Sequence, residues 1–293
     1  GYDVVSAINE RIIYAQVKGF AEGSPYEKFL SFDMIGQSVG GLLSITGEPD
    51  GPPMKPGTTV GDTGTGMLMA ISILSALYQR QSTGKGQRIQ VAMQDAMLQY
   101  SRIAYSVQMV TGKAGPRTGN KVISAATAPS GIYPCKPGGP NDYVYIYTTR
   151  AANHQWERLL QEIGREDLIG EARFETARKR LDNEAEIDAV LTEWTMQRSK
   201  REAMEILGAA GVPAGAVLDT LELYNDPDLE ERGMFQAISH PERGDLKVAG
   251  WPVKMSESNV PVAPAPLLGE HTEPVLGDWL GLGPDEVVAL KDE

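Results

Sequence analysis

The chain has 293 residues, a formal charge of −12, and a composition that is 41% hydrophobic and 23% charged. This balance is typical of a folded globular protein and excludes a disordered chain, collagen and a long coiled coil. Nucleic acid is excluded as the main partner, because binding to a phosphate backbone depends on clustered lysine and arginine. The single cysteine, Cys135, cannot form a disulfide within the chain, so we expect a reducing, cytoplasmic compartment. The most apolar stretch, residues 66–77, is too short to cross a bilayer, and we expect no membrane contact.

The first third of the chain alternates between helical and strand patterns. Residues 1–9 have a helical pattern, and residues 11–17 are rich in the β-branched and aromatic residues of a buried strand. Residues 67–80 are apolar on almost every side, which predicts a helix that is buried on most of its faces. A second strand at 87–93 and a helix at 95–109 follow. This alternation is typical of an α/β fold with a largely parallel sheet.

The composition changes after residue 110. Residues 111–130 are rich in Gly, Pro, Ser and Thr, which predicts a linker or a long functional loop. Residues 131–135 and 143–147 flank a turn and predict a β-hairpin, and charged amphipathic helices follow it. We therefore divide the chain into four parts: part of a large α/β domain (1–110), a linker and loop (111–130), a small α+β domain (131–217), and a linker that returns to the large domain (218–293).

The segment Gly61-Asp62-Thr63-Gly64-Thr65-Gly66 is the strongest candidate for a catalytic site. It carries an acidic residue into the start of a helix, where backbone N–H groups attract negative charge, and its glycines let a substrate approach closely. A carboxylate in this place could attack an activated acyl group, and the same N–H groups could stabilise the resulting oxyanion. In the alternative interpretation, Asp62 is only the N-cap of the helix, a position that favours aspartate. The order of the glycines matches neither the dinucleotide fingerprint nor the P-loop.

Other reactive residue types do not form a recognisable site. The three histidines are His154, His240 and His271. Their spacing is not that of metal ligands, so we expect no metal. No G-x-S-x-G motif of a serine hydrolase is present. We expect Cys135 to be a buried structural thiol, because no base accompanies it in the sequence.

Several short motifs, taken in their order along the chain, resemble one family. They are residues 17–23 (Val-Lys-Gly-Phe-Ala-Glu-Gly), 50–53 (Asp-Gly-Pro-Pro), 61–67 (Gly-Asp-Thr-Gly-Thr-Gly-Met), 83–87 (Thr-Gly-Lys-Gly-Gln), 92–96 (Ala-Met-Gln-Asp-Ala) and 266–272 (Pro-Leu-Leu-Gly-Glu-His-Thr). Together they resemble the class III CoA-transferases, the group of formyl-CoA:oxalate CoA-transferase and carnitine CoA-transferase. The resemblance extends from Gly1 to the C-terminus.

The resemblance implies an α/β enzyme with a Rossmann-like large domain, a smaller α+β domain and an interlocked homodimer. The family's active-site aspartate falls on Asp62. In the implied mechanism, Asp62 attacks the thioester of a donor acyl-CoA to form a mixed anhydride, and CoA thiolate converts this anhydride to an aspartyl-CoA thioester. A small acceptor carboxylate then forms a second anhydride, from which CoA returns to the acceptor. Coenzyme A is a co-substrate in this scheme, and no tightly bound cofactor is expected.

Two further segments correspond to the family's site, each with departures. The CoA-contacting stretch falls on Leu30, Ser31, Phe32 and Asp33, with Leu30 in place of a basic residue. On local sequence alone, Phe32 is interpreted as a core residue and Asp33 as hydrogen-bonded or solvated. The formyl-CoA enzymes have a run of glycines that closes over the acyl intermediates. The corresponding substrate loop, within the 111–130 segment, is Ala125, Ala126, Thr127 and Ala128, which has less backbone freedom than glycine.

Two alternatives to CoA transfer are open. The first is an acyl-CoA racemase of the same superfamily, which needs an acid/base pair. Those relatives carry a histidine ahead of the aspartate, whereas no histidine precedes His154 here. The second is a non-catalytic CoA-binding fragment, because family members begin with additional βαβ units that do not precede Gly1. We expect these units to be either truncated or supplied by a separate chain.

Overall fold

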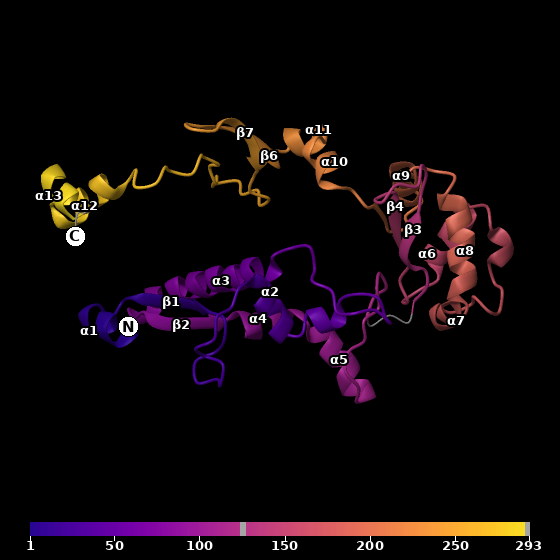
Figure 1. Cartoon of the computed structure of the whole chain (residues 1–293). Helices are drawn as coiled ribbons and strands as arrows, with labels where there is room; N and C mark the ends of the chain where they lie inside the picture. Colours follow the sequence, from indigo (N-terminus) through magenta and orange to yellow (C-terminus); the bar gives the residue numbers. More distant parts are fainter. Residues whose placement is uncertain (124–126, 291–293) are drawn as a thin grey trace. The chain divides into compact units, whose positions relative to one another are not determined.

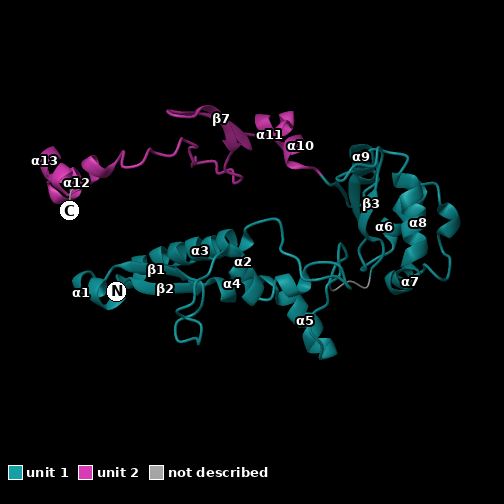
Figure 2. Cartoon of the chain, viewed as in Figure 1, with its two compact units in different colours: residues 1–217 teal, residues 218–293 magenta. Residues whose placement is uncertain are grey.

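The computed structural model describes residues 1–123 and 127–290 and comprises two compact units, 1–217 and 218–293 (Figures 1 and 2). The first unit contains an α/β part, which ends with helix α5, and a small α+β part, which begins with strand β3. The mixture of helices with small sheets confirms the predicted α/β class.

The α/β part is built on two parallel strands. Strands β1 (Ile13–Lys18) and β2 (Gln87–Ala92) pair in register from Ile13 opposite Gln87 to Lys18 opposite Ala92. The helices around this pair are α1 (Tyr2–Ile8), α2 (Asp33–Val39), the 3₁₀ helix η1 (Leu43–Ile45), α3 (Val60–Thr83), α4 (Met93–Tyr100) and α5 (Arg102–Thr111). Parallel strands need a crossover, and here α2, η1 and α3 form it.

Helix α3 runs antiparallel to the two strands. Its C-terminal end lies at the start of β1, because Arg80 donates to the backbone oxygen of Arg11 and Arg11 donates to that of Gly84. The start of α3 is therefore at the carboxyl edge of the strands. Ligands bind at this edge in open α/β sheets, so the fold places the Gly61–Gly66 segment where a binding site is expected.

The small α+β part holds the main apolar core. The predicted hairpin is present as β3 (Ser130–Pro134) and β4 (Tyr143–Tyr147), and β5 (Ala214–Ala216) pairs antiparallel to β4. Valine and isoleucine of β4 are buried, while its tyrosines are half-buried. The helices are α6 (His154–Glu162), η2 (Glu166–Leu168), α7 (Ala177–Asp182), α8 (Glu184–Thr195) and α9 (Lys200–Ala209). Their buried faces and the sheet share one cluster that includes Trp156, Leu160, Phe174, Ile187 and Leu207.

The second unit consists of short elements. They are α10 (Thr220–Tyr224), α11 (Pro227–Glu231), the antiparallel strands β6 (Phe235–His240) and β7 (Gly244–Ala249), α12 (Thr272–Leu280) and α13 (Pro284–Ala289). Asp219 and Asp226 cap α10 and α11 by accepting from backbone N–H groups of the first turn.

Three expectations about the helices are wrong. The helix expected at 67–80 begins at Val60, and it is not buried on most faces, because Met67, Ile71, Leu74 and Tyr78 are exposed. In length and composition alone its 24 residues could cross a bilayer, but the core helix of a soluble protein passes the same test, so this finding does not overturn the expectation of no membrane contact. The helix expected at 95–109 is divided into α4 and α5.

Candidate active site

Asp62 is the third residue of α3, and the helix is not capped by it. The N-cap position belongs to Thr59, whose side chain makes no capping hydrogen bond. Asp62 is exposed, and within residues 1–123 and 127–290 its carboxylate has no hydrogen-bond or ion-pair partner. The interpretation of Asp62 as the N-cap is therefore wrong, and its carboxylate is open to solvent at the first turn.

Asp33, from a different helix, performs the capping. Its Oδ1 accepts from the backbone N–H of Gly61 at 2.8 Å and of Asp62 at 3.3 Å. Its Oδ2 accepts from Nε2 of Gln37 at 2.7 Å. Two of the first-turn N–H groups expected to be free for an oxyanion are thus already bound to a carboxylate.

The glycines of the 61–66 segment have separate structural reasons. A Cβ at Gly61 would lie 2.6 Å from the backbone oxygen of Asp33, and a Cβ at Gly64 would lie 2.6 Å from the ring of Tyr100. The hydroxyl of Tyr100 also donates to the backbone oxygen of Gly64 at 3.0 Å. Gly66 alone faces open space. Close packing of α2 and α4 on α3 therefore accounts for two of the three glycines.

The stretch expected to contact CoA lies beside this helix start. Leu30 and Phe32 are strongly exposed, at 88% and 70%, and Ser31 packs against Gly19 just after the carboxyl end of β1. The expectation that Phe32 is a core residue is wrong. Asp33 is 5% exposed, and its carboxylate faces α3 through the contacts described above. Two exposed apolar side chains, Leu30 and Phe32, thus precede the buried carboxylate of Asp33 at the edge of the sheet.

The expected substrate loop is described only in part. Ala125 and Ala126 lie outside the described residues. Thr127 and Ala128 are buried, and Thr127 Oγ1 donates to the backbone oxygen of Thr148 at 2.7 Å. The guanidinium of Arg180 donates to the backbone oxygen of Ala128 at 2.9 Å. The carboxyl-terminal end of this loop is therefore fixed to the small α+β part.

The remaining reactive side chains do not gather into a site. Cys135 is fully buried, and burial raises the pKa of its thiol, which agrees with a structural role. In residues 1–123 and 127–290 no group of three or more His, Cys, Asp or Glu side chains is arranged to hold a metal. Gln37 and Tyr100, which contact the start of α3 or its cap, were not singled out from the sequence. The four-residue spacing of Asp33 and Gln37 on one helix face was the available signal for Gln37.

Comparison with known proteins identifies the family of the chain. The family model described as CoA-transferase family III matches residues 1–272. A protein of Streptomyces coelicolor named formyl-CoA:oxalate CoA-transferase is 40% identical over 303 aligned residues, which cover 99% of this chain and 72% of that protein. A protein of the same name from Rhodopseudomonas palustris is 36% identical, with the same coverage. The crystal structure of a CAIB/BAIF family protein from Brucella suis has a TM-score of 0.78 and 30% identity, covering 95% of this chain and 70% of that one.

The chain belongs to CoA-transferase family III. The match covers both the exposed Asp62 and its cap, Asp33. Family membership gives the enzyme class, a CoA-transferase, and the enzymes of this family use coenzyme A thioesters as substrates.

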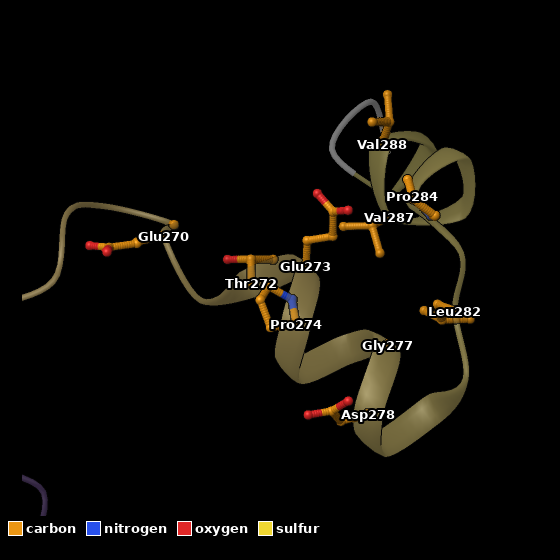
Figure 3. Close-up of a pocket in the computed structure, with 11 residues that line it drawn as sticks. Glu270, Thr272, Glu273, Pro274, Gly277, Asp278, Leu282, Pro284, Val287 and Val288 are labelled. Atoms are coloured by element: carbon orange, nitrogen blue, oxygen red, sulfur yellow. The ribbon is translucent and has the colours of Figure 1, made fainter.

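This family III CoA-transferase also has a cavity in its second unit, away in sequence from Asp62. Its volume is about 550 Å³, and it lies between α12 and α13 (Figure 3). Glu270, Glu273 and Asp278 contribute carboxylates to its lining. Such a lining does not suit an anionic CoA thioester, and we assign it no role in the transfer.

Proposed function

We propose that this protein moves CoA from an acyl-CoA thioester to a small carboxylic acid, with Asp62 as the nucleophile. The observation that carries the proposal is the exposed carboxylate of Asp62, without a partner in residues 1–123 and 127–290, on the first turn of α3. The first-turn N–H groups of Gly61 and Asp62 are bound by Asp33, so the Asp62 carboxylate is not used to cap the helix. Asp62 is thus left for chemistry.

The first half of the reaction transfers CoA to the enzyme. A carboxylate oxygen of Asp62 attacks the carbonyl carbon of the acyl-CoA, the C–S bond breaks, and CoA leaves as the thiolate. The thiolate sulfur then attacks Cγ of Asp62 within the mixed anhydride. The C–O bond to the anhydride oxygen breaks, the donor acid leaves as its carboxylate, and an aspartyl-CoA thioester is formed.

The second half repeats these steps in reverse order with the acceptor. A carboxylate oxygen of the acceptor attacks Cγ of the aspartyl thioester, and CoA thiolate leaves as a second anhydride forms. The thiolate attacks the acyl carbon of the acceptor, which breaks its bond to the Asp62 oxygen and regenerates the Asp62 carboxylate. No net proton is consumed, so the scheme needs no general base.

The proposed substrate contacts surround this carboxylate. We assign contact with CoA to Leu30, Ser31 and Phe32, which offer exposed surface at the carboxyl edge of the strands. We assign the loop Ala125, Ala126, Thr127 and Ala128 to the acyl group. Formyl-CoA and oxalate are the first pair to test, because the similar proteins of Streptomyces and Rhodopseudomonas carry those names.

The proposal extends to assembly and compartment. We infer a homodimer, because α3 exposes a row of apolar side chains spaced for one face: Met67, Ile71, Leu74 and Tyr78. We also infer a cytoplasmic enzyme without membrane contact or tightly bound cofactor, in keeping with its one reduced cysteine, Cys135.

Replacement of the nucleophile tests the proposed function. Asp62→Ala should lower the rate of CoA transfer at least about 1,000-fold, because the covalent intermediates cannot form. In the unchanged protein, incubation with acyl-CoA followed by hydroxylamine or borohydride should modify Asp62, as read by peptide mass spectrometry. Asp3→Ala, at an exposed aspartate in α1, is the matched control and should transfer normally.

Two outcomes contradict the proposal. A folded Asp62→Ala protein with full transfer activity removes the nucleophile assignment. Exchange of the α-proton of a bound acyl-CoA with deuterated water, without any transfer, supports the racemase instead.

A further inference from the structure

The contacts of Asp33 differ from those of a residue that binds CoA. The side chain is 5% exposed, and its two carboxylate oxygens are directed to protein groups: Gly61 and Asp62 N–H through Oδ1, and Gln37 Nε2 through Oδ2. In the described part of the chain no lysine or arginine pairs with it. The helix N-terminus supplies the favourable field in place of a cation.

Gln37 extends this set of contacts to the chain that enters α3. It is completely buried, and its Nε2 donates both to Asp33 Oδ2 at 2.7 Å and to the backbone oxygen of Thr58 at 3.2 Å. One amide therefore links α2, the carboxylate and the residue just before the N-cap. Its Oε1 is buried without a partner in the described structure, a cost that the two hydrogen bonds of Nε2 offset.

These bonds fix the residue that carries the nucleophile. Asp33 binds the backbone N–H of Asp62 itself and that of its neighbour Gly61. The absence of a side chain at Gly61 allows the approach, since a Cβ there would also lie 2.9 Å from Asp33 Oδ1. The backbone of Asp62 is held by α2, whereas its own carboxylate makes no such bond. Precise placement of a nucleophile is worth orders of magnitude in rate.

We propose that Asp33, supported by Gln37, is a positioning residue for Asp62 and not a contact for CoA. This inference rests on the proposed function, since it gives Asp33 the task of presenting the Asp62 carboxylate to the thioester. It also means that the Gly61 and Asp62 N–H groups are reserved for Asp33. Donors for the oxyanion of the anhydride step must then come from other groups.

The substitution Asp33→Asn separates positioning from CoA binding. An asparagine can still accept through Oδ1, but its Nδ2 meets the Nε2 donor of Gln37, and Gln37 cannot rotate to accept from it without giving up the bond to Thr58. We expect the rate of Asp62 thioester formation at saturating acyl-CoA to fall about 10- to 100-fold. The dissociation constant for CoA, measured by calorimetry, should be unchanged, as should both quantities in the Asp3→Asn control.

Opposite results overturn the inference. If Asp33→Asn binds CoA more weakly but forms the thioester at a normal rate at saturation, Asp33 is a contact for CoA. If neither the affinity nor the rate changes, Asp33 has no role in either binding or positioning. Asp62→Ala is measured alongside: if it keeps full transfer activity, the proposed function fails, and if it loses activity while Asp33→Asn behaves normally, only the positioning role fails.

A second variant covers the case in which Asp33→Asn does not fold. Gln37→Met has a similar volume, removes the buried unmet acceptor and deletes the donor to Asp33 and Thr58. We expect its melting temperature to fall by about a few degrees, because Asp33 Oδ2 and the Thr58 oxygen lose their donor. In the folded variant the rate of thioester formation should fall in the same direction as in Asp33→Asn, by a smaller factor. A normal rate in folded Gln37→Met removes the supporting role of Gln37 and overturns the inference.

Discussion

The glycines of the 61–66 segment differ in what surrounds them, and stability measurements can separate them. Gly61→Ala would place a Cβ 2.6 Å from the Asp33 backbone, so α2 and α3 must move apart, and we expect the free energy of unfolding to fall by about 1–3 kcal/mol. Gly66→Ala adds a methyl group in open space and should stabilise the helix by about 0.5–1 kcal/mol. Urea denaturation measures both. Equal effects of the two substitutions would contradict the close approach of Asp33.

Arg180 shows how one buried charge can fix a loop. It is fully buried, stacks near Trp156, and donates to the backbone oxygens of Ala128 and Phe174 and to Oδ1 of Asn153. Burial lowers the pKa of its guanidinium to about 10, which is still far above neutrality, so the group stays protonated at pH 7. The guanidinium is thus a cation held by neutral acceptors alone in the described structure.

Removal of this side chain should be costly. Arg180→Met leaves two buried backbone oxygens and the partly buried Oδ1 of Asn153 without their donor, and we expect the free energy of unfolding to fall by about 3 kcal/mol. Arg178→Met is the matched control on the same helix. Arg178 is exposed and, among the described residues, pairs only with Asp182 at the surface, so its loss should change the free energy by less than about 0.5 kcal/mol. If Arg180→Met lowers the free energy of unfolding as little as Arg178→Met does, the buried hydrogen bonds of Arg180 do not hold the end of the loop at Ala128.

At the residue level, the sequence led to Asp62 but not to its surroundings. The motif and its place before an apolar helix are local properties, and they are visible in the chain. The identity of the cap is not local, because Asp33 lies 29 residues before Asp62 and meets Gly61 only through the packing of α2 on α3. Aspartate preference at N-caps therefore pointed to Asp62, the wrong carboxylate.

Among the elements, those with strong periodicity or turn residues were predicted well. The hairpin of β3 and β4 and the strands β1 and β2 follow from β-branched and aromatic runs between turns. The break between α4 and α5 at Ser101 was missed because no glycine or proline marks it in the sequence. In the structure both the N–H and the hydroxyl of Ser101 still bond back to Met97, as in a continuous helix. The pairing of β6 with β7 was missed because residues 235–240 mix polar and apolar side chains.

Helix α3 was misjudged for a reason that concerns the whole molecule. An apolar pattern on nearly every side predicts burial on nearly every side. Within residues 1–217, α3 packs on β1, β2, α2 and α4, and these cover only part of its circumference. The sequence of the helix thus predicts more burial than the first unit, residues 1–217, provides.

A second copy of the chain is the partner that this face is expected to contact. Ile71 and Leu74 are 61% and 65% exposed, and full burial of each such side chain contributes about 1.5–3 kcal/mol. We expect the double substitution Ile71→Glu and Leu74→Glu to convert a dimer to monomers in sedimentation equilibrium, because two buried carboxylates cannot be solvated there. Met196→Glu, at an exposed methionine beyond α8, should remain dimeric. Circular dichroism of the double variant shows whether α3 still folds. If the unchanged protein is a monomer at all concentrations, or if the folded double variant remains a dimer, this face of α3 does not form the interface, and its apolar side chains must be covered by something other than a second copy.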